Sequence, residues 1–358
     1  MASLKEKIGQ MFMIGLRGTE LSADERSLLG AYPFGGFILF NQNLKAPKQI
    51  LALCRSLWEI GGEAPPFIAI DQEGGRVHRL PPPFTHFPPA AALGRTGNAD
   101  LAYRTGLATA RELAAVGVNL NFAPVLDVHS NPANPIIGDR ALSSDPNEVA
   151  RLGTAVIRGL REGGVIPCAK HFPGHGDTAQ DSHLELPAVR KEAGELKSVE
   201  LLPFVQACRD GVEAIMTAHV LYPALDPDYP ATLSRSIGTG LLRQELGYDG
   251  VVFGDDLEMK AISGNYSLED AVSLSLLAGI DTLLFCHDAG QAVKALDFLC
   301  REVERKSELR AKVEGSSRRI ERLKARALPN FSGAPDNEIQ NRIGLCHKRI
   351  AEELQGSL

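Results

Sequence analysis

The stretch GVVFGDD, residues 250–256, is an apolar run that ends directly in two aspartates. A near-continuous apolar run of this length is typical of a β-strand that is buried on both faces. Seven more runs of the same kind occur along the chain: QMFMIG (10–15), GGFILF (35–40), PFIAID (66–71), NLNFAPVLD (119–127), VIPCAKHF (165–172), AIMTAH (214–219) and TLLFCH (282–287). The sequence therefore predicts eight buried strands.

Helical patterns lie between most of these runs. Apolar residues recur at spacings of three and four in 101–117 and in 146–163, which is the periodicity of an amphipathic helix. Strands that alternate with helices indicate an α/β protein with a parallel sheet. Two architectures fit this alternation, a closed (β/α)8 barrel and a doubly wound open sheet.

Polar side chains at the strand ends favour the first architecture. They follow most of the apolar runs, at Asp71, Asp127, Lys170, His171, His219, Asp255 and His287. A barrel enzyme builds its site from the carboxyl ends of many strands around one mouth, whereas an open sheet concentrates such residues at one crevice. We therefore predict a single (β/α)8 TIM-type barrel over residues 1–325, with a C-terminal linker and helical extension over 326–358.

The composition argues against several classes of protein. The chain has 358 residues, 44% of them hydrophobic, and a net charge of −6 without a lysine or arginine block. We therefore expect a sizeable core and no nucleic-acid partner. No apolar stretch approaches the roughly 18–20 residues of a membrane helix, so we expect no membrane association. The scattered cysteines form no C-x-x-C pair and no signal peptide is recognisable, which favours reduced thiols and a cytoplasmic location.

Two motifs supply candidate binding residues. In DQEGGRV (71–77), Asp71 follows a buried strand and, together with Arg79 just beyond the motif, suits the recognition of hydroxyl groups. The alternative is an Asp–Arg pair that only closes a tight loop. In NPIIGDRALSSDP (134–146), Asp139 and Arg140 lie on a long connection of the kind that often covers a ligand. Neutralisation of nearby acids is an equally good interpretation of Arg140.

The two aspartates at the end of GVVFGDD have different expected roles. Adjacent side chains on a strand point to opposite faces, so one of Asp255 and Asp256 enters the barrel mouth and the other is structural. A carboxylate on rigid scaffold is what a covalent nucleophile needs. The alternative role, a helix N-cap, is common for aspartate, and we expect one residue to perform each.

The stretch KHFPGHGDTAQDSHLELP, residues 170–187, has three interpretations. A phosphate-binding P-loop is excluded because its G-x-x-x-x-G-K-[ST] pattern is absent. A zinc site is conceivable from the types of side chain present, although the glycines and proline indicate an irregular loop. In the third interpretation, Asp181 and His183 project from one face of an extended segment. The aspartate then raises the pKa of the imidazole and makes it a proton donor near neutral pH; an inert histidine is the alternative.

These motifs together resemble a known family. KHFPGHGDTAQDSH, FGDDLEM, DQEGGRV and GDR are similar to motifs of the β-N-acetylhexosaminidases of glycoside hydrolase family 3. The single-domain bacterial cytosolic enzymes of peptidoglycan recycling are the nearest group. The resemblance extends over roughly residues 6–300 and leaves out the C-terminal tail.

The resemblance implies a reaction and a set of site residues. It implies retaining hydrolysis of a sugar or muropeptide substrate through a covalent glycosyl–enzyme intermediate, without a cofactor or metal. By motif position, the nucleophile is Asp255 and the proton donor is His183, paired with Asp181. The implied sugar-binding residues are Asp71, Arg79, Arg140, Lys170 and His171. We expect His175 to be structural and to hold the turn by hydrogen bonds.

Four functions are compatible with these residues. The favoured one is an exo-acting β-N-acetylglucosaminidase that releases GlcNAc from a GlcNAc–anhydro-MurNAc muropeptide. A β-N-acetylglucosaminide phosphorylase is the nearest alternative, because a histidine acid/base does not repel an incoming phosphate as a carboxylate does. A zinc-dependent hydrolase that uses the histidine stretch is the third. The fourth, a non-catalytic sugar-binding barrel, is disfavoured because both a nucleophile and an acid are present.

Overall fold

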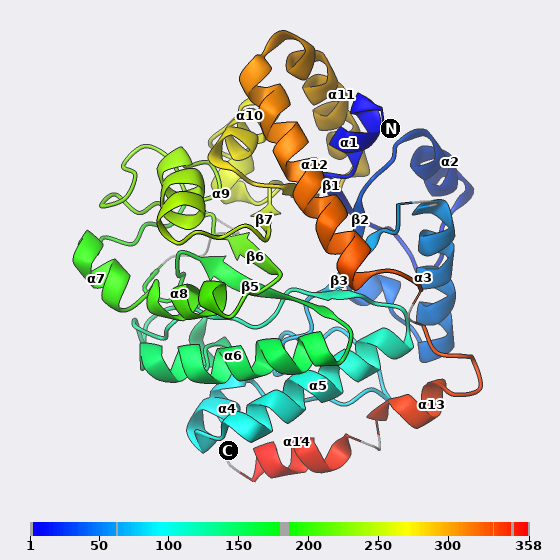
Figure 1. Ribbon diagram of the computed structural model, residues 1–358. Helices are drawn as coiled ribbons and strands as arrows, with labels where there is room; N and C mark the ends of the chain where they lie inside the picture. Colours follow the sequence, from blue (N-terminus) through cyan, green and yellow to red (C-terminus); the bar gives the residue numbers. More distant parts are fainter. Residues whose placement is uncertain (1–2, 62–63, 180–185, 332, 345–346, 357–358) are drawn as a thin grey trace.

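The computed structural model describes residues 3–61, 64–179, 186–331, 333–344 and 347–356. Within them, eight parallel strands close into a barrel in which each strand pairs with its neighbours in chain order (Figure 1). The strands are β1 (Phe12–Gly15), β2 (Gly36–Leu39), β3 (Phe67–Ile70), β4 (Leu120–Asn121), β5 (Ile166–Phe172), β6 (Ala214–Thr217), β7 (Val251–Asp256) and β8 (Thr282–Phe285). The predicted (β/α)8 barrel is confirmed, and all eight strands lie within the predicted runs.

The fourth strand is much shorter than the run NLNFAPVLD predicts. Only Leu120–Asn121 forms regular ladder pairs with both neighbours. Pro124 follows shortly afterwards, and a proline has no backbone N–H to donate to a ladder. Beyond it the chain still runs beside β5, through an isolated bridge between Val125 and Lys170. Asp127 therefore still reaches the mouth of the barrel, although it lies outside a regular strand.

Helices surround the barrel (Figure 1). Before β5 they are α1 (Leu4–Gly9), α2 (Ala23–Ala31), α3 (Pro47–Gly61), α4 (Ala90–Thr96), α5 (Ala99–Ala115) and α6 (Pro146–Glu162), with short 3-10 turns η1 (Asn41–Asn43) and η2 (Gly138–Arg140). After β5 they are α7 (Ala193–Ser198), α8 (Leu202–Arg209), the π-helical η3 (Ser236–Glu245), α9 (Lys260–Ser263), α10 (Leu268–Ala278), α11 (Ala289–Arg305), α12 (Ser307–Ala327), α13 (Ile339–Arg342) and α14 (Lys348–Gln355).

The interior of the barrel is filled by side chains from opposite strands. The ring of Phe253 on β7 packs edge-on against Phe67 on β3 at 5.8 Å and against Phe122 at 5.5 Å between centroids. Edge-to-face pairs at this separation are favourable beyond the apolar area that they bury. The packed interior leaves the residues at the carboxyl ends of the strands as the floor of the mouth.

Helices α5 and α6 pack closely because glycines face each other between them. A Cβ on Gly106 would lie 2.5 Å from the carbonyl oxygen of Val156, and one on Gly159 would lie 2.2 Å from that of Tyr103. Larger residues at either position would force the helices apart. The close pair makes α5 a rigid support, and one face of α5 remains available to the C-terminal region.

The C-terminal region packs on the outside of the barrel as helices, as predicted. The ammonium group of Lys324 on α12 is buried and donates to the Gln10 side chain at 2.6 Å and to the Gly35 carbonyl at 2.7 Å. Gln10 and Gly35 precede β1 and β2, so α12 is anchored at the amino ends of the strands, away from the mouth. Helices α13 and α14 lie beside α4 and α5 (Figure 1).

Two observations bear on the expected environment of the chain. Among the described residues, no helix combines the length and apolar character that crossing a bilayer demands. The described cysteines are all free thiols. Cys54, Cys168 and Cys286 are buried, and Cys208 and Cys300 are half-buried. These cysteines therefore behave as apolar core residues, as the sequence predicts.

Candidate active site

A pocket of about 620 Å³ opens at the carboxyl ends of the strands. The chain brings residues from β2, β5, β6, β7 and β8 and from several connecting loops to its walls. Six of the eight predicted site residues line it: Asp71, Arg79, Arg140, Lys170, His171 and Asp255. The other two, Asp181 and His183, lie outside the described residues. The mouth of the barrel is therefore the candidate active site.

Asp255 lies at the end of β7, where it lines the pocket and is half-buried. Its carboxylate accepts a hydrogen bond from the backbone N–H of Asp256 at 2.8 Å. Burial alone would raise the pKa of this carboxyl, but the neighbouring His219 and His171 outweigh burial and hold the pKa below its ordinary value. Asp255 is therefore ionised at neutral pH, the state in which a carboxylate can attack an electrophilic carbon.

Asp256 has the structural role that the sequence predicts for one of the pair. One carboxylate oxygen accepts from the backbone N–H of Glu258 at 3.1 Å and from that of Cys286 at 3.3 Å. These bonds cap the turn after β7 and tie it to the end of β8. Burial raises the pKa of Asp256 to about 6, so the two adjacent aspartates titrate in different ranges.

A buried cluster of two cations and two carboxylates forms one wall of the pocket. The Lys170 ammonium lies 2.7 Å from a carboxylate oxygen of Asp71 and 2.7 Å from one of Glu73. The Arg140 guanidinium binds Glu73 with two hydrogen bonds of 2.8 Å. The side chains of Lys170, Glu73 and Arg140 are only 3%, 6% and 12% exposed. Two full positive charges are therefore held at the wall of the pocket in fixed positions.

Glu73 is the residue of this cluster that sequence reasoning missed. Burial alone would raise the pKa of its carboxyl, yet Lys170 and Arg140 together hold that pKa far below its ordinary value. Glu73 thus links two of the predicted sugar-binding residues. The signal was present, because Glu73 stands two positions after Asp71 in DQEGGRV. The pattern alone does not show which cations a carboxylate meets.

The same contact bears on the two interpretations of Arg140. Arg140 does neutralise a nearby acid, as one interpretation holds, and it also lines the pocket, as the other requires.

Arg79 is held more loosely than Arg140. Its guanidinium lies 4.0 Å from Asp71 and 5.9 Å from the centre of the Phe40 ring, and its buried Nε has no hydrogen-bond partner among the described residues.

His171 is oriented by a buried aspartate. Its Nδ1 lies 2.7 Å from a carboxylate oxygen of Asp127, and its backbone N–H donates to the other oxygen at 3.1 Å. Burial alone would raise the pKa of Asp127, but His171 and His175 hold it below its ordinary value. A carboxylate at Nδ1 fixes the orientation of the ring and leaves Nε2 for another partner. Asp127 was recognised in the sequence only as a polar strand end.

His175 is a buried structural residue. Its backbone N–H donates to Asp127 at 2.7 Å, and its Nδ1 lies 2.9 Å from the hydroxyl oxygen of Thr178. Burial, with a smaller contribution from His171, lowers its pKa to about 4. His175 is therefore neutral at pH 7. It holds the turn after β5, as the sequence analysis expects.

Asn134 connects two loops at the mouth. Its amide nitrogen donates to the carbonyls of His175 and Gly176 at 2.9 and 3.0 Å, and its oxygen accepts from the backbone N–H groups of Ile136 and Ile137. The loop that carries Arg140 is thereby attached to the segment that leads towards residue 180. The sequence pattern does not mark Asn134 as a link between loops, because these partners are backbone groups that carry no side-chain signature.

The described residues offer no metal centre. They contain no group of three or more histidine, cysteine, aspartate or glutamate side chains that could hold a metal ion. Of the ligand types in the histidine stretch, His171 and His175 are engaged by Asp127 and Thr178. Asp181 and His183 lie outside the described residues, so a chelation experiment is the test of the zinc alternative.

The pocket at the barrel mouth thus holds an ionised carboxylate, two paired cations and hydrogen-bond donors, a set of groups that suits the hydroxyl groups of sugars. The sequence agrees, because residues 3–323 match the glycosyl hydrolase family 3 N terminal domain. The chain belongs to this family and is a glycoside hydrolase.

Comparison with known members of the family shows which kind of family 3 enzyme this chain is similar to. A β-hexosaminidase of Thiobacillus denitrificans is 42% identical over 281 residues, which are 77% of this chain and 77% of that protein. The family 3 β-N-acetylglucosaminidase of Paenibacillus sp. str. FPU-7 has a TM-score of 0.91 and 41% identity, covering 100% of this chain and 69% of that one. NagZ of Neisseria gonorrhoeae, solved with N-trifluoroacetyl-D-glucosamine, has a TM-score of 0.78 and 29% identity, covering 97% of each. The protein is a family 3 glycosidase of the β-hexosaminidase type.

Proposed function

We propose that the protein is an exo-acting, retaining β-N-acetylglucosaminidase with Asp255 as nucleophile and His183, paired with Asp181, as acid/base. Its catalytic domain is residues 1–325, and residues 326–358 form an extension. The observation that carries the proposal is the position of Asp255. It is an ionised carboxylate on a rigid strand end, in the same pocket as the Lys170–Arg140 cluster.

The reaction has two steps in this proposal. A carboxylate oxygen of Asp255 attacks the anomeric carbon while His183 donates a proton to the glycosidic oxygen, so the bond to the leaving sugar breaks and a neutral alcohol departs. A water molecule then attacks the glycosyl–aspartate ester, gives its proton to His183 and releases the sugar. Two inversions at the anomeric carbon retain its configuration.

The buried cluster supports the binding half of the proposal. Lys170 and the Asp71 carboxylate provide a donor and acceptors for ring hydroxyls, and both are already hydrogen-bonded to each other before substrate enters. Groups held in place in this manner need little reorganisation when charge develops in the transition state. We assign sugar binding to Asp71, Arg79, Arg140, Lys170 and His171.

The natural substrate in this proposal is a peptidoglycan-derived GlcNAc–anhydro-MurNAc muropeptide, cleaved in the cytoplasm. The support for this substrate is the resemblance of four motifs to the peptidoglycan-recycling group of the family. The buried free thiols Cys54 and Cys168 support a reducing compartment. Release of GlcNAc from a purified GlcNAc–anhydro-MurNAc peptide, at a kcat/KM above that for chitobiose, is the expected result.

The nucleophile assignment is tested with p-nitrophenyl β-GlcNAc. Asp255→Asn should lower kcat by at least about a thousandfold, because the attacking group is lost. Asp255→Ala with added azide should form the α-glycosyl azide, since azide enters from the face that the carboxylate occupied. Asp336→Asn, at an exposed carboxylate of the C-terminal extension, is the matched control and should keep normal turnover. Normal turnover by Asp255→Asn would falsify the assignment.

Two further experiments test whether water or phosphate accepts the sugar and whether the enzyme requires a metal. Product analysis in phosphate and in phosphate-free buffer should give GlcNAc in both; GlcNAc-1-phosphate as the main product would replace the hydrolase by the phosphorylase. Dialysis against a chelator should leave kcat unchanged. A loss of activity that zinc restores would replace the metal-free mechanism by the zinc-dependent one.

A further inference from the structure

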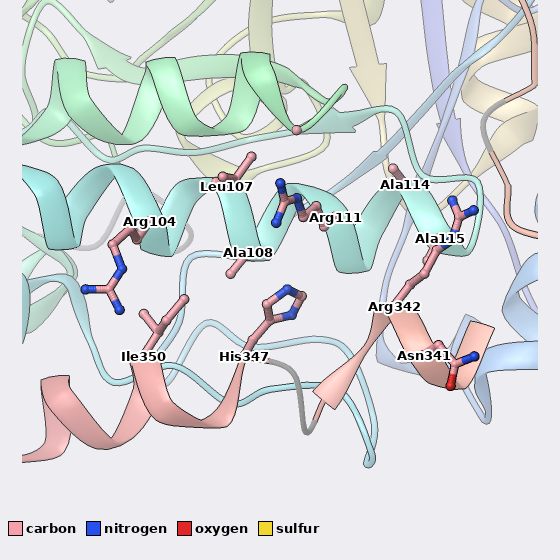
Figure 2. Close-up of a pocket in the computed structure, with 11 residues that line it drawn as sticks. Arg104, Leu107, Ala108, Arg111, Ala114, Ala115, Asn341, Arg342, His347 and Ile350 are labelled. Atoms are coloured by element: carbon pink, nitrogen blue, oxygen red, sulfur yellow. The ribbon is translucent and has the colours of Figure 1, made fainter. Parts of the chain in front are cut away.

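A second pocket lies far from the barrel mouth, between α5 and the C-terminal helices. It has a volume of about 600 Å³ and is formed by α5 on one side and by α13 and α14 on the other. Figure 2 shows His347 and Ile350 extending from the start of α14 towards α5, with Arg104 and Arg111 extending from α5. The family match ends at residue 323, so α13 and α14 lie beyond the matched domain.

The charged side chains that line this pocket are all cationic. They are Arg104, Arg111 and Arg342, and none of the described residues that line it is acidic. In the part of the chain that the structure describes, the Arg111 side chain has no hydrogen bond or ion pair. Three guanidinium groups around one hollow create a positive potential that favours an anion. A guanidinium also binds carboxylate and phosphate through paired N–H donors.

The other two arginines already have carboxylate partners. The Arg104 guanidinium binds Glu353 with two hydrogen bonds of 3.0 and 3.2 Å and lies 3.9 Å from Asp100, and Arg342 pairs with Glu338 at 2.8 Å. The single Arg342–Glu338 contact is at the surface, where an ion pair contributes little to stability. An anion that binds two of the arginines at once competes with these carboxylates, and most easily with Glu338. His347 also lines the pocket, and its Nδ1 lies 2.9 Å from a carboxylate oxygen of Glu112.

The apolar part of the pocket lining suits an organic ligand. Ala108 and Ala115 on α5 and Ile350 on α14 provide apolar surface beside the arginines. The volume lies in the range of small-molecule sites, and it exceeds what a single inorganic ion requires. We propose that this pocket binds a small organic anion with two or more carboxylate or phosphate groups, independently of the sugar site at the mouth.

Citrate and pyrophosphate are suitable probes. Citrate presents carboxylate groups, and pyrophosphate presents phosphate groups. With the full chain, isothermal titration and thermal unfolding at constant ionic strength should show one saturable site for at least one probe. At about ten times the Kd, the unfolding midpoint should rise by about 2–4 °C. The Arg111→Gln variant should weaken the Kd at least about tenfold and remove the shift, because Arg111 is the lining cation that has no ion pair among the described residues.

The control variant is Arg301→Gln, which removes one exposed positive charge from α11 without touching the pocket. It should leave the Kd and the shift unchanged. Stabilisation that rises linearly with probe concentration, or equally in both variants, is a general salt effect and would overturn the proposal. Absence of saturable binding by either probe would overturn it as well. GlcNAc hydrolysis should be unchanged in Arg111→Gln, which keeps this test separate from that of the proposed function.

Discussion

Two regions of the protein hold cations, and they differ in how the positive charge is neutralised. At the barrel mouth, Lys170 and Arg140 are buried, and each is matched to a carboxylate within 2.8 Å. In the arginine pocket, formed by Arg104, Arg111 and Arg342 between α5 and the C-terminal helices, the cations are partly exposed. Arg104 and Arg342 have surface partners, and Arg111 has no ion pair with any residue that the structure describes. The sign of the charge is the same in both regions, and the difference lies in what neutralises it.

The difference follows from the cost of removing a charge from water. A buried cation that lacks a partner is strongly destabilising, so the mouth must supply its own carboxylates and is ordered before substrate arrives. An exposed cation remains hydrated and needs no internal partner. The arginine pocket can therefore leave neutralisation to a ligand. One region is preorganised for an uncharged sugar, and the other is open to an anion.

The largest effect is expected from breaking the cluster at the mouth. Glu73→Gln removes the carboxylate shared by Lys170 and Arg140, leaves both cations under-compensated and should lower the free energy of unfolding by about 3–5 kcal/mol. It should also lower kcat/KM by about a hundredfold or more, because the two cations to which we assign sugar binding lose their fixed positions. Urea unfolding and p-nitrophenyl GlcNAc kinetics measure the two effects.

The matched control is the exposed Arg76–Asp139 pair on the neighbouring loop, at 3.1 Å. Asp139→Asn should change the unfolding free energy by less than about 1 kcal/mol. Equal losses in the two variants would contradict the contrast between buried and exposed charges.

A smaller effect is expected from the pH dependence of stability at the mouth. In the unfolded chain His175 binds a proton near its ordinary pKa of 6.5, whereas in the folded protein its pKa is about 4. The unfolded state therefore binds more protons between these values, and stability falls as pH drops from about 6.5 to about 4, by on the order of 3 kcal/mol for this residue. His175→Gln should reduce the proton uptake on unfolding at pH 5 by about one.

Urea unfolding at several pH values measures this slope. Gln355→Ala is the control, because Gln355 is exposed on α14 and carries no ionisable group. Its pH dependence should follow that of the unmodified protein. An unchanged slope in His175→Gln would show that the buried imidazole does not contribute to the pH dependence of the unfolding free energy.

The smallest effect is expected at the arginine pocket. Glu353→Gln removes the surface carboxylate that pairs with Arg104, so the unfolding midpoint should stay within about 1 °C. The Kd for the better of the two probes should tighten about two- to fivefold, since the competing carboxylate is gone. Glu352→Gln on the same helix, where Glu352 faces Lys348, is the control. Weaker probe binding in Glu353→Gln would reverse the expected direction.

Much of the fold could be predicted from the sequence because the signals are local. A run such as VIPCAKHF, which is almost continuously apolar, indicates a strand that is buried on both faces, and it forms β5 over Ile166–Phe172. The extent of β4 was predicted wrongly, because the apolar run continued past Pro124 while the hydrogen-bond ladder did not. The mouth was predicted from polar residues at strand ends, and Asp71, Lys170 and Asp255 all line it.

The sequence by itself determined most of the side chains that stand at the barrel mouth, since the alternation of strands and helices fixes their position along each strand, although it did not single out Glu73. Only the tertiary structure decided how those side chains pair. Glu73 meets Lys170 and Arg140, Asp127 meets His171, and α5 meets α13 and α14 across the arginine pocket. Ion pairing and desolvation depend on distances between groups far apart in the chain, and a linear pattern does not contain those distances.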